Sequence, residues 1–221
     1  MQIDNEAADK FDKYASLLVN YNEKVNLTAV TDPDDIVIKH FGDSLALIKY
    51  GKVNGSQRLA DIGTGAGFPG VPVLIAKPGI KLTLFDSVNK KLDFLRFLAN
   101  EIDIKPEIVH MRAEDAGNCE EYREKFDITC GRAVVQLRIL SEFCLPLTKV
   151  GGKFCAMKGD ISKEEKEPGI KSFSKLGGKL YEDNFYNIHN GDKRNMIIAK
   201  KISQTSSKYP RNMSRISKNP L

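Results

Sequence analysis

The sequence has no tryptophan, only three histidines and only four cysteines among its 221 residues. The cysteines, at positions 119, 130, 144 and 155, form no C-x-x-C pair and have no histidine at metal-ligand spacing, so we expect no metal site. Three of them lie inside apolar segments, where a reduced cysteine behaves as a small hydrophobic residue. A reactive thiolate needs a polar, electropositive setting. A nucleophilic role for Cys130 is therefore disfavoured.

Long hydrophobic runs are also missing. The first ten residues are polar and acidic, so they lack the basic start and apolar centre of a secretory signal, and no run is long enough to span a bilayer. We expect a cytoplasmic protein without membrane contact. The 41% hydrophobic content still excludes a mostly disordered chain, and 221 residues leave room for one sizeable domain plus an extra segment.

Acidic residues are absent after Asp192, whereas eight of the 34 lysines and arginines lie there. The rest of the chain therefore has 26 basic against 29 acidic residues, and the cationic charge is concentrated at the C-terminal end. Such an end is often only a solvated surface, but it favours a polyanionic partner, most naturally nucleic acid. Residues 203–221 are also rich in serine, which predicts a tail that is ordered only by contact with another molecule.

The most informative segment that is present reads LADIGTGAGFPG, at residues 59–70. Leu59, Ala60 and Ile62 fit a short buried strand, and the glycines that follow allow a sharp turn with positive φ and a close approach of a ligand to the backbone. These glycines also satisfy G-x-G-x-x-G, which by itself indicates a dinucleotide site. Asp61 argues against it, because a carboxylate before the turn repels a pyrophosphate and attracts an ammonium or sulfonium. S-adenosylmethionine carries both cations.

The remaining pattern alternates strands and helices. Helical spacing of apolar residues predicts two helices before the glycine segment, over residues 10–22 and 33–48, so residues 1–50 are interpreted as a helical extension. An α/β domain that contains the glycine segment then covers 51–202, and 203–221 is the basic tail. Further strands are predicted at 81–85, 107–111, 126–130 and 153–157, with helices after residues 70, 91 and 136 and a closing antiparallel hairpin at 180–188 and 196–200. This alternation predicts a Rossmann-like α/β sandwich.

Candidate ligands follow successive predicted strands. In sheets of this kind, ligands bind beyond the carboxyl ends of the strands. Gly63 follows the first strand, Asp86 the second, Ala113 and Glu114 the third, and Arg132 the fourth. We expect Asp86 to accept hydrogen bonds from ribose hydroxyls, the Ala113–Glu114 pair to face the adenine edge, and Arg132 to contact cofactor or RNA.

Several segments resemble one bacterial family. DIGTGAGFPGVP, TLFDSVNKK, RAED, FDITCGRAV and KG, in this order, are similar to the ribosomal RNA small subunit methyltransferase G family, also called glucose-inhibited division protein B. The resemblance extends to NLTAV at 26–30, to His40 and DSL at 43–45, and to YPR and KNPL near the C-terminal end. It therefore covers nearly the whole chain.

The resemblance implies a class I fold that transfers a methyl group from S-adenosylmethionine to N7 of one guanine in 16S ribosomal RNA. The family's cofactor contacts map onto Gly63, Phe68, Ala113, Glu114 and Arg132. Guanine N7 has a free lone pair and no proton to lose, so no catalytic acid or base is assigned. The expected partner is 16S ribosomal RNA or the small ribosomal subunit, and we expect the protein itself to be a monomer.

The residues predicted to contact RNA are His40, Lys158, Lys208 and Arg211. A local packing role for His40 is an equal alternative. Two other functions stay open at this point: an NAD(P)-dependent oxidoreductase, which Asp61 disfavours, and a non-catalytic RNA-binding protein with the same fold, which the intact glycine segment disfavours.

Overall fold

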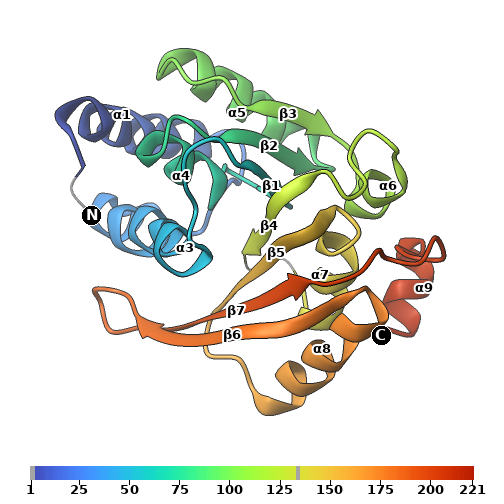
Figure 1. Cartoon of the computed structure of the whole chain (residues 1–221). Coiled ribbons are helices and arrows are strands. Elements are labelled where there is room, and N and C mark those ends of the chain that lie inside the picture. The colour runs from blue at the N-terminus through green and yellow to red at the C-terminus, as the bar shows by residue number, and fades with distance from the viewer. Residues whose placement is uncertain (1–2, 133–134) are drawn as a thin grey trace.

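A seven-stranded sheet organises the molecule (Figure 1). The structure, a computed structural model, describes residues 3–132 and 135–221. The strand order is β3-β2-β1-β4-β5-β7-β6; the first five strands in this order are parallel, and β7 and β6 are antiparallel to their neighbours. The strands are β1 Arg58–Ile62, β2 Lys81–Asp86, β3 Glu107–His110, β4 Phe126–Arg132, β5 Thr148–Lys158, β6 Gly178–Asn187 and β7 Lys193–Lys201. The predicted Rossmann-like sheet and its closing hairpin are confirmed.

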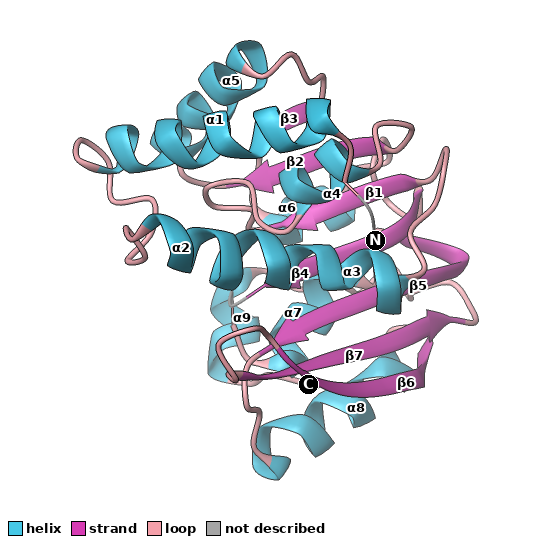
Figure 2. Cartoon of the chain, turned by 90° about the vertical axis from the view of Figure 1, so that its left-hand side faces the viewer, coloured by secondary structure: helices cyan, strands magenta, loops and turns pink. Residues whose placement is uncertain are grey.

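Helices cover both faces of the sheet, and each face has its own apolar core (Figure 2). The first face carries α1 Asn5–Asn22, α2 Pro33–Asp35, the π-helix η1 Ile36–Gly42, α3 Asp43–Gly51, α4 Gly70–Ala76 and α5 Asn89–Glu101. The second carries α6 Ala113–Asn118, α7 Leu137–Cys144, α8 Lys163–Lys175 and α9 Met213–Lys218. Because both faces are covered, the central strands β1 and β2 are buried at every residue after the first.

The N-terminal helices belong to the first core. Tyr14, Leu18, Ile36 and Leu47 are fully buried, in the same cluster as apolar residues of α4 and α5. The single helix predicted at 33–48 is interrupted by η1, a wider turn of the kind that often lies at functional sites. This places His40 and its neighbours against the strand ends.

Helix α8 was not predicted from the sequence. It contains Pro168 and many charged residues, which mask its helical signal. Ser162 begins it, because its side chain accepts a hydrogen bond from the backbone amide of Glu165. Packing against α7 holds the helix despite the proline, with the Ser172 hydroxyl 2.7 Å from that of Ser141.

The C-terminal tail corrects a prediction. Residues 203–221 are ordered by contacts with the chain itself: Thr205, Tyr209 and Ile216 are buried in or beside the second core. The guanidinium of Arg123 donates to three backbone carbonyls of the tail, at residues 205, 206 and 209. Composition alone predicted disorder, whereas buried apolar side chains of the tail and its hydrogen bonds with Arg123 and Glu142 dock this segment on the second face.

Candidate functional site

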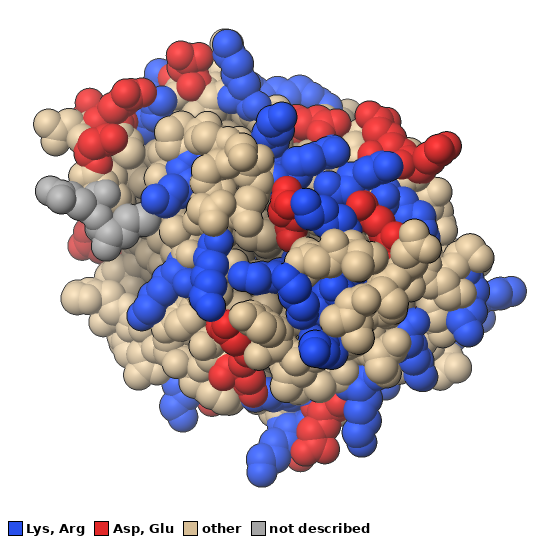
Figure 3. Space-filling model, in the orientation of Figure 1, with Lys and Arg blue, Asp and Glu red and all other residues tan. Residues whose placement is uncertain are grey.

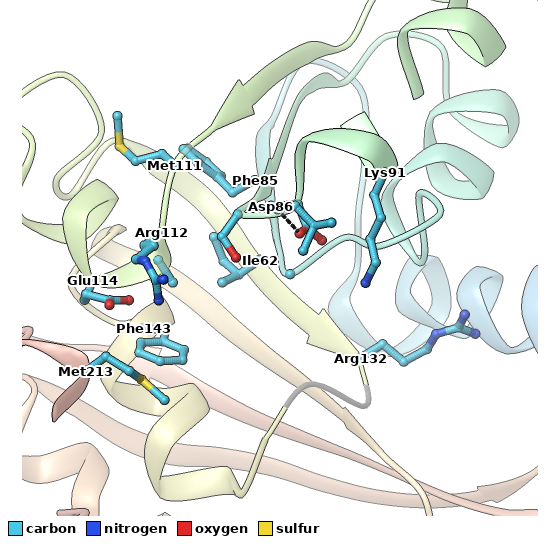
Figure 4. A pocket seen from close by; sticks show the side chains of 14 residues that line it. Ile62, Phe85, Asp86, Lys91, Met111, Arg112, Glu114, Arg132, Phe143 and Met213 are labelled. Atoms are coloured by element: carbon cyan, nitrogen blue, oxygen red, sulfur yellow. Dashed lines mark hydrogen bonds between the residues drawn. The ribbon is translucent and has the colours of Figure 1, made fainter. Parts of the chain in front are cut away.

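A cavity of about 390 Å³ opens at the carboxyl ends of the parallel strands (Figure 4). Its wall contains five of the six residues predicted to bind the cofactor, and these lie at or shortly after the ends of four different strands. The five are Gly63, Asp86, Ala113, Glu114 and Arg132. The parallel topology therefore brings together residues that lie up to 69 positions apart in the sequence, as expected for a sheet of this class.

The glycine turn after β1 is held by Asp86. Gly63 and Gly65 have φ values of 68° and 60°, which glycine adopts at little cost. One carboxylate oxygen of Asp86 accepts the Gly65 amide at 2.9 Å, and the other accepts the Val88 amide at the same distance. Asp86 thus orders the turns after β1 and β2 and also forms part of the cavity wall.

Asp61 does not take the place expected for it. Its side chain is fully buried below the glycine turn, and it is not part of the cavity wall. Oδ2 accepts the Thr64 hydroxyl at 2.8 Å and the Gly70 amide at 2.9 Å, while Oδ1 has no hydrogen-bond partner among the described residues. Burial raises the pKa of Asp61 to about 6. Asp61 therefore fastens the glycine turn from below and does not form part of the cavity wall.

The end of the cavity that lies away from Arg132 is lined by Glu114, Phe143 and Met213 (Figure 4). Ile62, Phe85 and Met111 add apolar surface. Sequence analysis missed Phe143 and Met213, because α7 and α9 reach the site only through packing on the second face. No signal in the sequence separates them from ordinary core residues.

Phe68 is the one predicted cofactor contact that the structure does not place on the cavity wall. Its ring is nearly buried, stacked between the rings of Tyr14 and His40 at centroid distances of 5.4 and 4.4 Å. The guanidinium of Arg132 lies 4.9 Å from the centre of the same ring. Phe68 therefore ties the glycine segment to the N-terminal helices.

Arg132 connects the cavity with those helices. In Figure 4 it lies at the end of the pocket opposite Glu114 and Met213. Its Nη1 donates to the carbonyls of Lys39 and His40 at 3.1 and 3.4 Å and is 3.4 Å from Asp43 Oδ2. Burial lowers the pKa of Arg132, and Asp43 opposes this effect. A cation held this firmly near the glycine turn suits an anionic or electron-rich ligand group.

Comparison with known proteins identifies the family. The model of a family described as rRNA small subunit methyltransferase G matches residues 7–197. A "Ribosomal RNA small subunit methyltransferase G" of Acetivibrio thermocellus is 46% identical over 100% of this chain and 91% of its own length, and one of Staphylococcus epidermidis strain RP62A is 44% identical over 100% and 93%.

The chain belongs to the rRNA small subunit methyltransferase G family.

Solved structures place the fold of this family member among methyltransferases. A putative methyltransferase of Bacillus halodurans superposes with a TM-score of 0.59 at 14% identity, over 73% of this chain and 99% of its own. A precorrin-6Y C5,15-methyltransferase of Geobacter metallireducens gives 0.54 at 12%, over 72% and 87%. Within the described residues, no helix is both long and apolar enough to cross a bilayer, and no cluster of side chains suits a metal ion.

The four predicted RNA contacts of this family member lie in different surroundings. The Lys158 ammonium donates to the Val135 carbonyl and pairs with Glu165, both at 2.8 Å. Lys208 is exposed. Arg211 Nε and Nη2 donate to the buried Glu142, which holds the guanidinium in the fold, and its contact with RNA stays a prediction. Basic and acidic side chains are interspersed on the face shown in Figure 3, so charge alone marks no single RNA track there.

His40 is a neutral partner of Arg132. Its Nδ1 lies 3.2 Å from Arg132 Nη2, a group that can only donate, so Nδ1 accepts and Nε2–H donates to the Thr28 hydroxyl at 2.8 Å. Burial, and then the Arg132 charge, lowers the pKa of His40 from 6.5 to about 4. The imidazole therefore contributes shape and a hydrogen-bond acceptor at neutral pH, and no charge.

This shift predicts a pH dependence of stability. Between pH 6.5 and 4 the unfolded chain binds more protons at His40 than the folded one, so the contribution is complete above pH 6.5 and is lost as the pH falls toward 4. The stability advantage of the natural protein over His40→Gln should shrink by up to about 1 kcal/mol per pH unit in this range. Urea unfolding of both proteins at pH 7 and pH 5 measures it; a constant difference would contradict the assignment.

Proposed function

We propose that this protein transfers a methyl group from S-adenosylmethionine to N7 of a guanine in 16S ribosomal RNA. The observation that carries the proposal is the full-length match to relatives named ribosomal RNA small subunit methyltransferase G, on a chain whose strand-end cavity retains the expected ligand residues. A ribosomal RNA substrate is consistent with action in the cytoplasm, and we propose that the protein acts as a monomer.

The cavity residues fit this cofactor. Apolar side chains of Ile62, Phe85 and Phe143 offer surface for a flat adenine ring. The Glu114 carboxylate makes no hydrogen bond with any other described residue, which leaves it available to a donor such as the adenine amino group. The buried Asp61 carboxylate, whose Oδ1 has no partner in the part of the chain that the structure describes, supplies a negative potential beneath the glycine turn. The lining of the cavity therefore suits an adenosine at the Glu114 end and a positively charged group at the end near the glycine turn.

The residues of the site need to align the reactants rather than move protons. When bound, S-adenosylmethionine supplies a methyl group on a positively charged sulfur. The N7 lone pair forms the new C–N bond as the C–S bond breaks with its electrons left on sulfur, so no proton must be removed. Alignment of the two reactants depends on rigid groups at the strand ends. Asp86 fastens the turn at Gly63, and Arg132 is bound to η1, so both sides of the cavity are held in place.

Glu114→Ala should weaken binding of S-adenosylmethionine about tenfold to a hundredfold, because a hydrogen bond to a charged group in a nearly buried position is lost. Calorimetric titration measures the dissociation constant. Asp115→Ala, which removes the exposed neighbouring carboxylate on the same helix, is the matched control and should bind normally. Equal affinities for Glu114→Ala and the natural protein would remove Glu114 from the adenosine site.

Methyl transfer to small subunits from cells that lack this protein tests the function directly. Radiolabelled methyl groups should appear in 16S RNA, and mapping should place them on N7 of one guanine. Binding of the cofactor without any transfer would favour the non-catalytic RNA-binding alternative. Calorimetric binding of NADH in place of S-adenosylmethionine would favour the oxidoreductase.

A further inference from the structure

A second cavity, of about 380 Å³, lies beside the first, and the two share Arg132. Its wall is built by η1 and α3 from the N-terminal region and by the ends of β4, β5 and β7, including His40, Asp43, Met157, Lys158 and Arg194. This volume is within the range of sites for small ligands. Two adjoining cavities with a shared arginine suit a reaction between two bound groups.

Asp43 is the centre of the second cavity. It is 4% exposed, and its Oδ2 is 3.4 Å from both Arg132 Nη1 and Arg194 Nε. Its Oδ1 accepts the Tyr186 hydroxyl at 3.0 Å. One carboxylate thus holds two guanidinium groups that come from strands β4 and β7, on either side of β5.

The distances show that these guanidinium groups are not saturated by Asp43. Charge-assisted N–H···O bonds are usually about 2.7–2.9 Å long, and both pairs here are at 3.4 Å. Both guanidinium groups share Asp43, and among the described residues Arg194 Nη2 has only one other carboxylate nearby, that of Asp192 at 3.6 Å. Both groups also lie in the wall of the open cavity. A further electron-rich ligand atom therefore has donors available.

Guanine supplies such an atom next to the reacting one. Its N7 and O6 are neighbouring acceptors on one edge of the base, and arginine is their commonest partner. A guanine in the second cavity with N7 directed at the first would present O6 to Arg132, because Arg132 lines both cavities. Adenine in the same position would present an amino donor to the guanidinium groups, which also only donate.

We propose that the second cavity holds the acceptor guanine and that Asp43 is a positioning residue, which orients Arg132 and Arg194 so that they bind O6 and select guanine over adenine. This rests on the proposed function. The apolar side chains of Val30 and Met157, in the same wall, provide a surface for the base ring.

The test compares transfer to small subunits that carry guanine, inosine or adenine at the mapped target position. Inosine keeps N7 and O6, whereas adenine keeps only N7. The natural protein should methylate guanine and inosine at rates within about threefold of each other and adenine about 10- to 100-fold more slowly. If inosine is as poor a substrate as adenine, the protein does not recognise O6, and the proposal is overturned.

Asp43→Asn tests the positioning role. It should lower the rate on guanine and inosine at least about tenfold, leave the slow rate on adenine nearly unchanged, and so reduce the selectivity. The exposed Asp93→Asn is the matched control and should behave as the natural protein does. An equal loss on all three bases, or no loss, would overturn the proposal.

Arg194→Gln keeps the Asp43–Arg132 pair and provides the same measurement if Asp43→Asn does not fold. It should also reduce the preference for guanine over adenine, and unchanged selectivity would overturn the proposal. Absence of transfer by the natural protein would refute the proposed function, whereas transfer with selectivity unaffected by either variant would refute only the guanine site.

Discussion

Arg132→Met is expected to lower the rate of methyl transfer about 100-fold or more while the protein stays folded. The guanidinium is part of the walls of both cavities and bonds to two carbonyls of η1, so its loss disturbs the alignment of both reactants at once. Asp43 keeps Arg194 and Tyr186 as partners, so no buried carboxylate is left alone. Transfer of labelled methyl groups to deficient small subunits measures the loss.

Arg96→Met provides the control for this variant. Arg96 is a half-exposed residue of α5 that pairs with Asp93 on the same helix, and its replacement should change neither transfer nor stability by a measurable amount. Thermal unfolding of both variants separates a lost function from a lost fold. Near-normal transfer by a folded Arg132→Met protein would show that the shared arginine is not needed to align the reactants.

Arg211→Met should destabilise the protein by about 3–5 kcal/mol. The Glu142 carboxylate is fully buried and accepts the Arg211 backbone amide, Nε and Nη2 at 2.9, 2.8 and 2.7 Å. Without the guanidinium, a charged group remains buried with one donor. Because Met213 follows two residues later and lines the first cavity, binding of S-adenosylmethionine should weaken as well.

Two further proteins make the Arg211 prediction specific. Arg215→Met removes an exposed arginine from the same tail and should leave the free energy of unfolding within about 0.5 kcal/mol of its natural value. The double replacement Glu142→Leu with Arg211→Met removes both charges and should recover most of the loss. Urea unfolding measures all three, and equal stability of the two single variants would contradict a tail held by this ion pair.

Local patterns in the sequence were sufficient for the sheet and for most of the first cavity. Apolar runs bounded by glycine or charged residues predicted strands near their observed places, and a ligand residue at each strand end could be chosen because parallel strands end at one edge. The same reasoning failed for α8, where proline and charge concealed a helix that packing stabilises. It failed also for the tail, whose order depends on Arg123 and Glu142 in distant segments.

The sequence by itself determined the family and the Rossmann-like sheet, and it singled out five residues that line the first cavity: Gly63, Asp86, Ala113, Glu114 and Arg132. Tertiary structure alone decided that Phe68 packs against the N-terminal helices, that Asp61 supports the turn from below, and that Asp43 gathers two arginines from separate strands. The physical reason is that backbone periodicity and turn geometry depend on neighbouring residues, whereas burial, ion pairing and pKa depend on which distant side chains the fold brings into contact.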